Sequence, residues 1–342
     1  MANDKTPWHE IARYAAACPS HHNTQPFRLR VLNPTEAEVI FLPQRGLPVV
    51  DPRGRFSWLC AGIFVEVCAV AAHALGFEIE ETPTFAALYP GGDTETPQSI
   101  VRLRLSAHAT LDDLGAQLIL DRQTSRLAYD GKPVPAALVA ELQAEAARCG
   151  HRFEVRTDTA AIAWVVELNR QALFGDMENE PLRSELARWL RYGKREEALR
   201  RDGMSARCLG FPAVLLKSFF TQTEFWTRPG IRSLAGHIYG RTMKGVGTIG
   251  WLRGPFATVA DWFAAGRTMI RLWLIVTRAG YYWHPYGSVI TSDSARAEMI
   301  RFFEITDEKG GTDMVWLLLR LGKSSTPPVS RRLPVEELLQ CA

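Results

Sequence analysis

Apolar and polar positions in the first third of the chain predict a small unit of helices and strands. Apolar residues from Trp8 to Ala17 recur at helical spacing, and this helix should end before Pro19 because a residue that precedes proline avoids the α region. The nearly all-apolar run 57–75 is typical of a helix buried on most sides. Short alternating runs predict strands at 27–31, 38–42, 77–81 and 100–105.

The rest of the chain alternates helices and strands over a longer stretch. Helices are predicted at 111–120, 135–148, 160–174, 181–201 and 261–280, and strands at 152–156 and 314–321. The residues 205–260 contain repeated Gly and Pro, so we expect an irregular excursion there that could act as a lid.

Two pairs of glycines suggest an internal repeat. Gly62 and Gly76 are 14 residues apart, as are Gly266 and Gly280, and each pair brackets an apolar helix followed at a distance by an apolar strand. If the repeat is real, lobes at 1–108 and 109–342 form a fused pseudo-dimer, and those helices line a two-fold-like interface. The chain is then expected to be a monomer.

Composition and charge narrow the class of protein. With 342 residues and 46% hydrophobic content, the chain can bury a large core. The 40 Lys and Arg residues are spread along the chain against 37 Asp and Glu, which does not favour nucleic-acid binding. The polar N-terminus has no apolar run of signal-peptide length, and the apolar stretch 269–283 contains two arginines, so we expect a cytoplasmic protein with no membrane segment. Six scattered cysteines predict reduced thiols and no metal site.

The loop 19–26 (PSHHNTQP) places several hydrogen-bonding side chains between two prolines. A rigid loop of this kind suits recognition of a planar polar edge. A well-satisfied turn is the alternative. A metal site at His21 and His22 is disfavoured, because adjacent histidines diverge and no acidic or Cys ligand lies nearby at ligand spacing.

Three further segments could contribute to a ligand site. Arg122 and Arg126 flank two hydroxyl side chains, an arrangement that can surround a phosphate, although a solvated loop would look the same. The basic pair before Leu333 could add a cation or be a solvated tail. The segment 284–288 (HPYGS) could pass a ligand or be an ordinary aromatic turn.

The loop 19–26 resembles the Pro-Ser-x-x-Asn-x-Gln-Pro-aromatic motif of the nitroreductase superfamily, in which it contacts the flavin ring bound by the other subunit. This resemblance implies that the flavin contacts are Pro19, Ser20, His21 and Asn23, with Gln25 supporting the loop. The segment at Arg122 resembles the family's Arg-x-Ser-x-Arg/Lys phosphate-binding segment.

In that register the phosphate-binding positions are Arg122, Thr124 and Arg126, with Thr in place of the usual Ser. The terminal segment resembles the family's basic-Leu-Pro sequence, which implies that Arg332 completes the phosphate site. The segment after the second buried helix implies contacts with the ring edge from Pro285, Tyr286 and Gly287.

Each lobe retains only one half of such a site. Nothing before Trp8 resembles the phosphate segment, and the sequence RCGHRFEV stands where the second lobe would need its own ring loop. The resemblance therefore implies a nitroreductase-like α+β fold, with antiparallel-type sheets flanked by helices, and one flavin mononucleotide (FMN) per chain. Length and several long segments, including 182–207, make the chain most similar to the fused, two-domain Acg-type branch.

The resemblance implies an FMN-dependent oxidoreductase that exchanges hydride or electrons with a nitro compound, a quinone or a specialised metabolite. A Gly-rich dinucleotide fingerprint is not visible, so an NAD(P)H donor would stack on the flavin. His21 and His22 are the candidates for proton transfer, against structural roles. The alternative is a protein that binds or sequesters flavin with little or no nitroreductase turnover.

Overall fold

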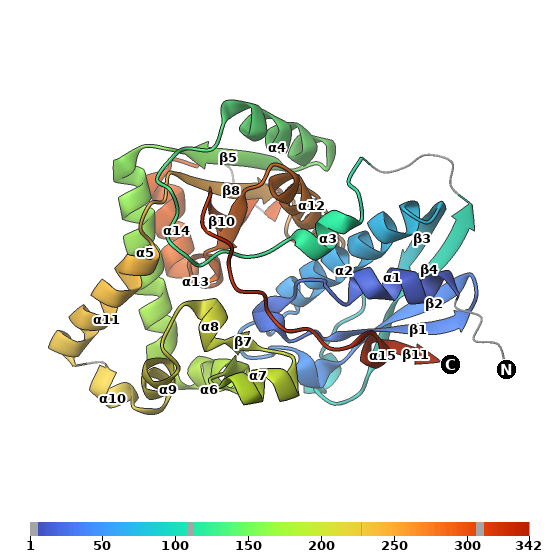
Figure 1. Cartoon of the computed structure of the whole chain (residues 1–342), viewed down its shortest axis with the longest axis horizontal. Coiled ribbons are helices and arrows are strands. Elements are labelled where there is room, and N and C mark those ends of the chain that lie inside the picture. The colour runs from blue at the N-terminus through green and yellow to red at the C-terminus, as the bar shows by residue number, and fades with distance from the viewer. Residues whose placement is uncertain (1–5, 108–112, 227, 306–310, 342) are drawn as a thin grey trace.

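Two sheets lie on either side of a pair of long apolar helices in the computed structural model, which describes residues 6–107, 113–226, 228–305 and 311–341 (Figure 1). The first sheet has the strand order β11-β1-β2-β4-β3, and the second β5-β8-β10-β9. All named strand pairs in the two sheets are antiparallel except β1 with β11. The expected α+β class with antiparallel-type sheets is confirmed.

The first sheet is built from the N-terminal part of the chain and receives one strand from the C-terminus. Its strands are β1 (Phe27–Asn33), β2 (Glu36–Phe41), β3 (Phe77–Pro83), β4 (Gln98–Ala107) and β11 (Leu339–Cys341). Its helices are α1 (Pro7–Ala15) and α2 (Arg55–His73), with short 3-10 turns η1 (His21–Asn23), η2 (Pro43–Arg45) and η3 (Pro90–Gly92). The predicted helices and strands of this part are therefore confirmed within a few residues.

More helices surround the second sheet than the first. Its strands are β5 (Arg152–Arg156), β8 (Thr248–Gly254), β9 (Tyr282–Pro285) and β10 (Met314–Gly322). The helices around it are α3 (Gln117–Asp121), α4 (Ala136–Arg148), α5 (Thr159–Glu178), α12 (Val259–Arg278), α13 (Gly287–Thr291), α14 (Asp293–Phe302) and α15 (Val335–Leu338). Strand β9 was not predicted, and the start of the predicted helix at 111–120 lies outside the described residues.

The two sheets share one connectivity. In each, the first two strands form an antiparallel pair, a long buried helix follows, and the fourth strand inserts between the second and third. A helix also precedes each first strand, α1 before β1 and α4 before β5. The boundary predicted at 108/109 falls outside the described residues, and the division into two lobes stays a prediction.

Helices α2 and α12 cross at two glycines, and the contact is reciprocal. A Cβ on Gly62 would lie 1.9 Å from the carbonyl oxygen of Phe263, and a Cβ on Gly266 would lie 1.9 Å from that of Leu59. The interpretation that these glycines bracket the helices was wrong, because both lie inside them. Each partner stands three residues before the opposite glycine, as a two-fold-related pair would.

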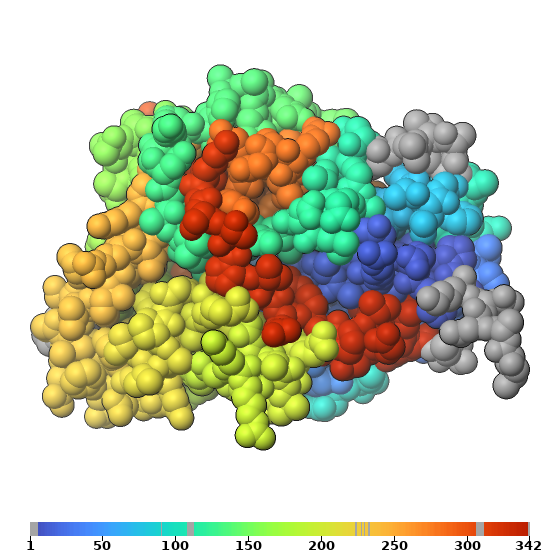
Figure 2. All heavy atoms as spheres, in the orientation of Figure 1, coloured from blue at the N-terminus to red at the C-terminus, as the bar shows by residue number. Residues whose placement is uncertain are grey.

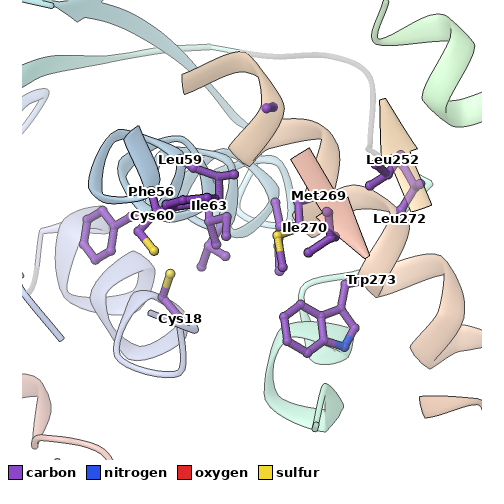
Figure 3. Packing of buried hydrophobic residues seen from close by; sticks show 14 of the residues in the cluster. Cys18, Phe56, Leu59, Cys60, Ile63, Leu252, Met269, Ile270, Leu272 and Trp273 are labelled. Carbon is purple, nitrogen blue, oxygen red and sulfur yellow. The ribbon is translucent and has the colours of Figure 1, made fainter. Parts of the chain in front are cut away.

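The packing around this crossing is mostly apolar, with ion pairs from Glu66 of α2 to Arg267 and Arg271 of α12. Figure 3 shows Leu59, Cys60 and Ile63 of α2 lying between Cys18 and the Met269–Ile270 side of α12. Helix α2 is long and apolar enough to cross a membrane by composition, but 94% of that apolar window is buried inside the protein. This is the pattern of a core helix.

Two expectations for the middle of the chain were wrong. The single helix at 181–201 is instead α6 (Glu180–Arg188), β6 (Leu190–Arg191) and α7 (Lys194–Arg200). A buried ion pair between Arg191 and Asp202, at 2.6 Å, ties β6 to the residues just after α7.

The segment 205–260 is not irregular. After β7 (Met204–Ser205) it contains α8 (Ala206–Leu209), α9 (Ala213–Thr221), α10 (Thr223–Trp226) and α11 (Pro229–Thr242), and it ends in β8. Its prolines start helices instead of breaking them, since Pro212 is the N-cap of α9 and Pro229 begins α11. Glycines obscured β8, a fully buried strand inside the second sheet.

Candidate functional site

A cavity of about 980 Å³ lies where the two halves of the molecule meet. One side is formed by the loop after α1 and the first turns of α2, and the opposite side by the segment after α3 and the start of α13. The C-terminal segment and the helices α5, α6 and α8–α11 complete its walls. Figure 2 shows the C-terminal segment, in red, running across this region between the yellow helices and the blue N-terminal part.

The cavity brings together nearly all the residues singled out from the sequence. Those that line it are Pro19, Ser20, His21, His22, Asn23, Arg122, Thr124, Arg126, Pro285, Tyr286, Gly287 and Arg332. Gln25 does not line it. Segments separated by more than a hundred residues thus share one space.

One end of the cavity is strongly cationic. Burial and the neighbouring Arg332 lower the pKa of Arg122 to about 9, and burial also lowers the pKa of Arg126 and of Arg332. Arg126 and Arg332 are half-buried and line the cavity. Within the described chain, no carboxylate pairs with any of the three.

Polar atoms without a partner occur at the same end. The Nε atoms of Arg122 and Arg332 and the Oε1 atom of Gln123 are buried with no hydrogen-bond partner within the described structure. The Arg122 guanidinium lies 4.3 Å from the centroid of the Trp273 ring, which supports it through a cation–π contact. Unpaired desolvated cations are costly, so this end is suited to a bound anion.

Arg320 of β10, which the sequence analysis missed, holds the chain just after Arg126 in place. It is fully buried and donates hydrogen bonds to the carbonyl oxygens of Leu127 (3.1 Å) and Thr242 (2.9 Å). Its guanidinium also lies 4.4 Å from the centroid of the Tyr129 ring. A single cation within the apolar run MVWLLLRL was the signal that could have revealed it, because a buried charge requires partners.

The loop after α1 has an unusual backbone. His22, Asn23 and Gln25 have φ values of +44°, +56° and +52°, in the left-handed region that residues other than glycine seldom adopt. The Ser20 hydroxyl accepts a hydrogen bond from the Gln25 amide at 2.9 Å, which closes the loop on itself. Such strain persists only where surrounding contacts determine the conformation, and it is common at binding sites.

Asn23 joins three segments of the chain. Its Nδ2 donates to the carbonyl oxygens of Gly203 and Arg331, both at 3.0 Å, and its Oδ1 accepts from Arg332 Nη1. Both amide hydrogens are thus engaged within the protein. Asn23 orients a cation of the cavity, and direct contact of its side chain with a ligand stays a prediction.

Gln25 anchors the same loop from outside the cavity. Its Nε2 donates to the carbonyl oxygen of Arg201 at 3.0 Å, and its Oε1 accepts from the Leu333 amide at 2.9 Å. Arg45 adds a second anchor, with bonds of 2.7 Å to both the Thr24 carbonyl and the Asp202 carboxylate. Arg45 and Asp202 were missed, because only the folded chain brings them to this loop.

The histidines beside the cavity are held in the neutral form. Burial lowers the pKa of His21 to about 4, and burial together with the nearby His21 and Arg126 lowers the pKa of His22 to about 3. Burial and two arginines, Arg126 and Arg320, lower the pKa of His284 well below its usual value. Neutral imidazoles can donate or accept a hydrogen bond but do not add charge to this cationic end.

The opposite wall of the cavity is apolar. It includes Leu173 and Phe174 of α5, Leu216 and Phe219 of α9, and Trp226 of α10. Asp176 is the one acidic residue among the described residues that line the cavity, and burial raises the pKa of its carboxyl. The cavity therefore offers cations at one end and a largely aromatic compartment at the other, which suits a planar ligand with an anionic tail.

Comparison with known proteins identifies relatives by sequence. Two Mycobacterium tuberculosis proteins, from strains CDC 1551 / Oshkosh and ATCC 25618 / H37Rv and each described as a "Putative NAD(P)H nitroreductase", are 31% identical to this chain over 184 residues. The match covers 54% of this chain and 51% of each relative, so it spans about half the length of those proteins. No protein-family model matches the chain.

Solved structures of similar arrangement are more distant. An FMN-dependent nitroreductase, NfnB, from Mycobacterium smegmatis in complex with NADPH has a TM-score of 0.40 at 16% identity over 65% of this chain and 94% of that one. A nitroreductase with bound FMN from Bacteroides fragilis has a TM-score of 0.35 at 13% identity, over 65% and 95% of the two chains. Neither likeness is close enough to carry a functional argument. Over about half of its length, the chain is therefore similar in sequence to mycobacterial proteins described as putative nitroreductases.

Proposed function

We propose that this protein is an FMN-dependent oxidoreductase that holds one FMN in the cavity between its two halves. The observation that carries the proposal is the cluster of Arg122, Arg126 and Arg332, three desolvated guanidiniums at one end of a cavity with no carboxylate paired to them in the described chain. A phosphate would neutralise these charges and accept hydrogen bonds from the orphaned Nε atoms.

The residues of the cavity fit such a cofactor. Arg122, Arg126 and Arg332 would hold the phosphate, with Thr124 adding a hydroxyl. The loop at Ser20 to Asn23 and the segment 285–287 would border the ring. The flavin would supply the hydride and electron transfer itself, and the protein would orient it and exclude water.

The size of the cavity supports a second molecule beside the cofactor. At about 980 Å³ it lies at the upper end of the range of roughly 300–1,000 Å³ that ligand pockets occupy. We propose that a small organic molecule, such as a nitro compound, a quinone or a specialised metabolite, binds against the apolar wall. NAD(P)H is the proposed donor, stacking transiently on the cofactor.

A second function, flavin binding or sequestration without nitroreductase turnover, is favoured by one feature. The layer of α9–α11 closes one side of the cavity. Hydrogen bonds from Asn23, Gln25 and Arg45 also fasten residues 201–204 to the loop 19–26. A site closed in this way would admit nicotinamide slowly.

Anaerobic mixing separates the two functions. The purified protein should be yellow, and mixing it with NADH or NADPH should bleach the flavin band within seconds if it is an oxidoreductase. A yellow protein that keeps its colour would favour sequestration. A colourless protein that does not take up added FMN would overturn both.

A further inference from the structure

Helices α9, α10 and α11 form a layer that is one helix thick at one end of the molecule (Figure 1). Their inward side chains line the cavity, yet apolar side chains also face outward. Val214 is 80% exposed, Leu234 is 54% exposed and Phe225 is 40% exposed. Four of the exposed large apolar residues of the described chain, these three and Leu215, lie within this short segment.

The same segment concentrates positive charge. Residues 211–245 contain five Lys or Arg residues and one Glu, whereas the totals for the whole chain, 40 basic and 37 acidic, are close to balance. Lys217, Arg228 and Arg241 are exposed, and within the described chain no carboxylate pairs with them. A charge asymmetry of this kind indicates an anionic partner.

Apolar and basic side chains alternate on the outer face. On α9, Val214 and Lys217 stand about one turn apart, and on α11 Leu234 precedes Arg241 by about two turns. The Arg228 guanidinium lies 5.9 Å from the centroid of the exposed Phe225 ring. Interfacial helices that rest on a lipid surface carry this combination, with apolar residues entering the headgroup region beside Lys and Arg.

We propose that this outer face, formed by Val214, Lys217, Phe225, Leu234 and Arg241, docks on the surface of a membrane that contains anionic phospholipids. The charge selects this occupant over a second copy of the chain, since a two-fold dimer through this face would oppose like charges. Each basic residue near such a surface contributes about 1 kcal/mol. With few apolar side chains, the association should be reversible and sensitive to salt.

Vesicle co-sedimentation of the full-length protein tests the proposal. We expect binding to vesicles of phosphatidylcholine mixed with phosphatidylglycerol, little binding to phosphatidylcholine alone, and release by added salt. The double variant Lys217→Glu/Arg241→Glu should lower the affinity for the anionic vesicles at least about tenfold. Val214→Ser/Leu234→Ser should weaken it by a smaller factor.

Matched controls lie on α7, outside this face. Leu199 is 81% exposed, and Arg195 is also exposed. Leu199→Ser and Arg195→Glu should leave vesicle binding unchanged, and flavin content should be equal in all variants because none of these residues lines the cavity.

Three results would overturn the proposal. They are failure to sediment with anionic vesicles, equal binding to both vesicle types, or equal losses in the α7 controls. A dimer in light scattering without lipid, dissociated by Val214→Ser/Leu234→Ser, would instead assign the face to a second copy. Because vesicle binding is measured without turnover, its outcome is independent of the oxidoreductase proposal.

Discussion

At the scale of single residues, Arg122, Arg126 and Arg332 carry the proposal of a bound anion. Arg332 is far along the chain from Arg122 and Arg126. Burial lowers the pKa of all three, and no carboxylate in the described structure neutralises them. A protein tolerates such a cluster when an anion compensates it. Substitution of one of these arginines is therefore a direct test of the proposed cofactor.

Replacing Arg126 should separate phosphate binding from ring binding. In Arg126→Ala we expect FMN affinity to fall at least about tenfold, because a hydrogen bond to a charged group contributes about 1.5–3 kcal/mol. The affinity for riboflavin, which has no phosphate, should be unchanged. Fluorescence titration with both flavins measures this, with Arg195→Ala as a control. Equal losses for FMN and riboflavin would contradict the assignment.

The neutral histidines predict how stability depends on pH. The pKa of His21 is about 4 and that of His22 about 3 in the folded protein, against 6.5 for an unperturbed histidine. Below pH 6.5 the unfolded chain therefore binds protons that the folded one does not, so the free energy of unfolding should fall as the pH drops from 6.5 toward 4.

Melting temperatures across this pH range test the effect. His22→Asn should flatten the dependence, since Asn tolerates the left-handed backbone at this position but does not titrate. His9→Asn, outside the cavity, is the control. A wild-type slope retained in His22→Asn would show that His22 is not held neutral.

At the scale of elements, the crossing of α2 and α12 positions the site. Both helices contribute residues to the cavity, Leu59 and Ile63 from α2 and Met269 and Trp273 from α12. Their close approach depends on two glycines, each against a carbonyl oxygen of the opposite helix. Neither side of this contact has a flexible side chain that could move aside.

Replacing either glycine should be severe. Gly62→Ala and Gly266→Ala should each lower the free energy of unfolding by at least about 3 kcal/mol, the upper range for overpacking, because the added carbon meets backbone. Because the contact is the same on both helices, the two variants should lose similar amounts of stability. Gly175→Ala in α5, where the added carbon meets nothing within 4 Å, should be neutral or stabilising. Denaturant titration measures all three, and a tolerated Gly62→Ala would refute the close crossing.

The sequence predicted most helices and strands around this crossing, but it did not predict the elements in the middle of the chain. Helical periodicity and strand alternation are local signals, so α2, α4, α12 and β10 were found within a few residues. Strand β8 was missed because its glycines weaken the alternating pattern, and only its neighbours β5 and β10 make it a buried strand.

At the scale of the whole molecule, the two halves differ in what surrounds their shared helix pair. The connection between α1 and β1 spans residues 16–26, whereas that between α4 and β5 spans only 149–151. Arg267 directly follows the crossing glycine Gly266 on α12, as Ile63 directly follows Gly62 on α2. Arg267 forms ion pairs with Glu66 and Glu81.

This asymmetry predicts one FMN per chain. The molar ratio of extracted flavin to protein should be close to one, and light scattering should give the mass of a single chain. The connection between α4 and β5 is too short for a second loop like 19–26, and ion pairs hold Arg267 at the position equivalent to Ile63. A ratio of two, or a dimer with one flavin per pair of chains, would contradict the proposed asymmetric site.

The sequence by itself determined the chemistry that each segment can offer. The loop at Ser20, the arginines at 122 and 126 and the terminal Arg332 were recognised because residue type and spacing are local properties of the chain. Only the tertiary structure decided which of them share a cavity, that Arg320 fixes the chain just after Arg126, and that Asn23 holds Arg332. These contacts join residues far apart in the sequence, and their energies depend on burial and geometry that exist only once the chain has folded.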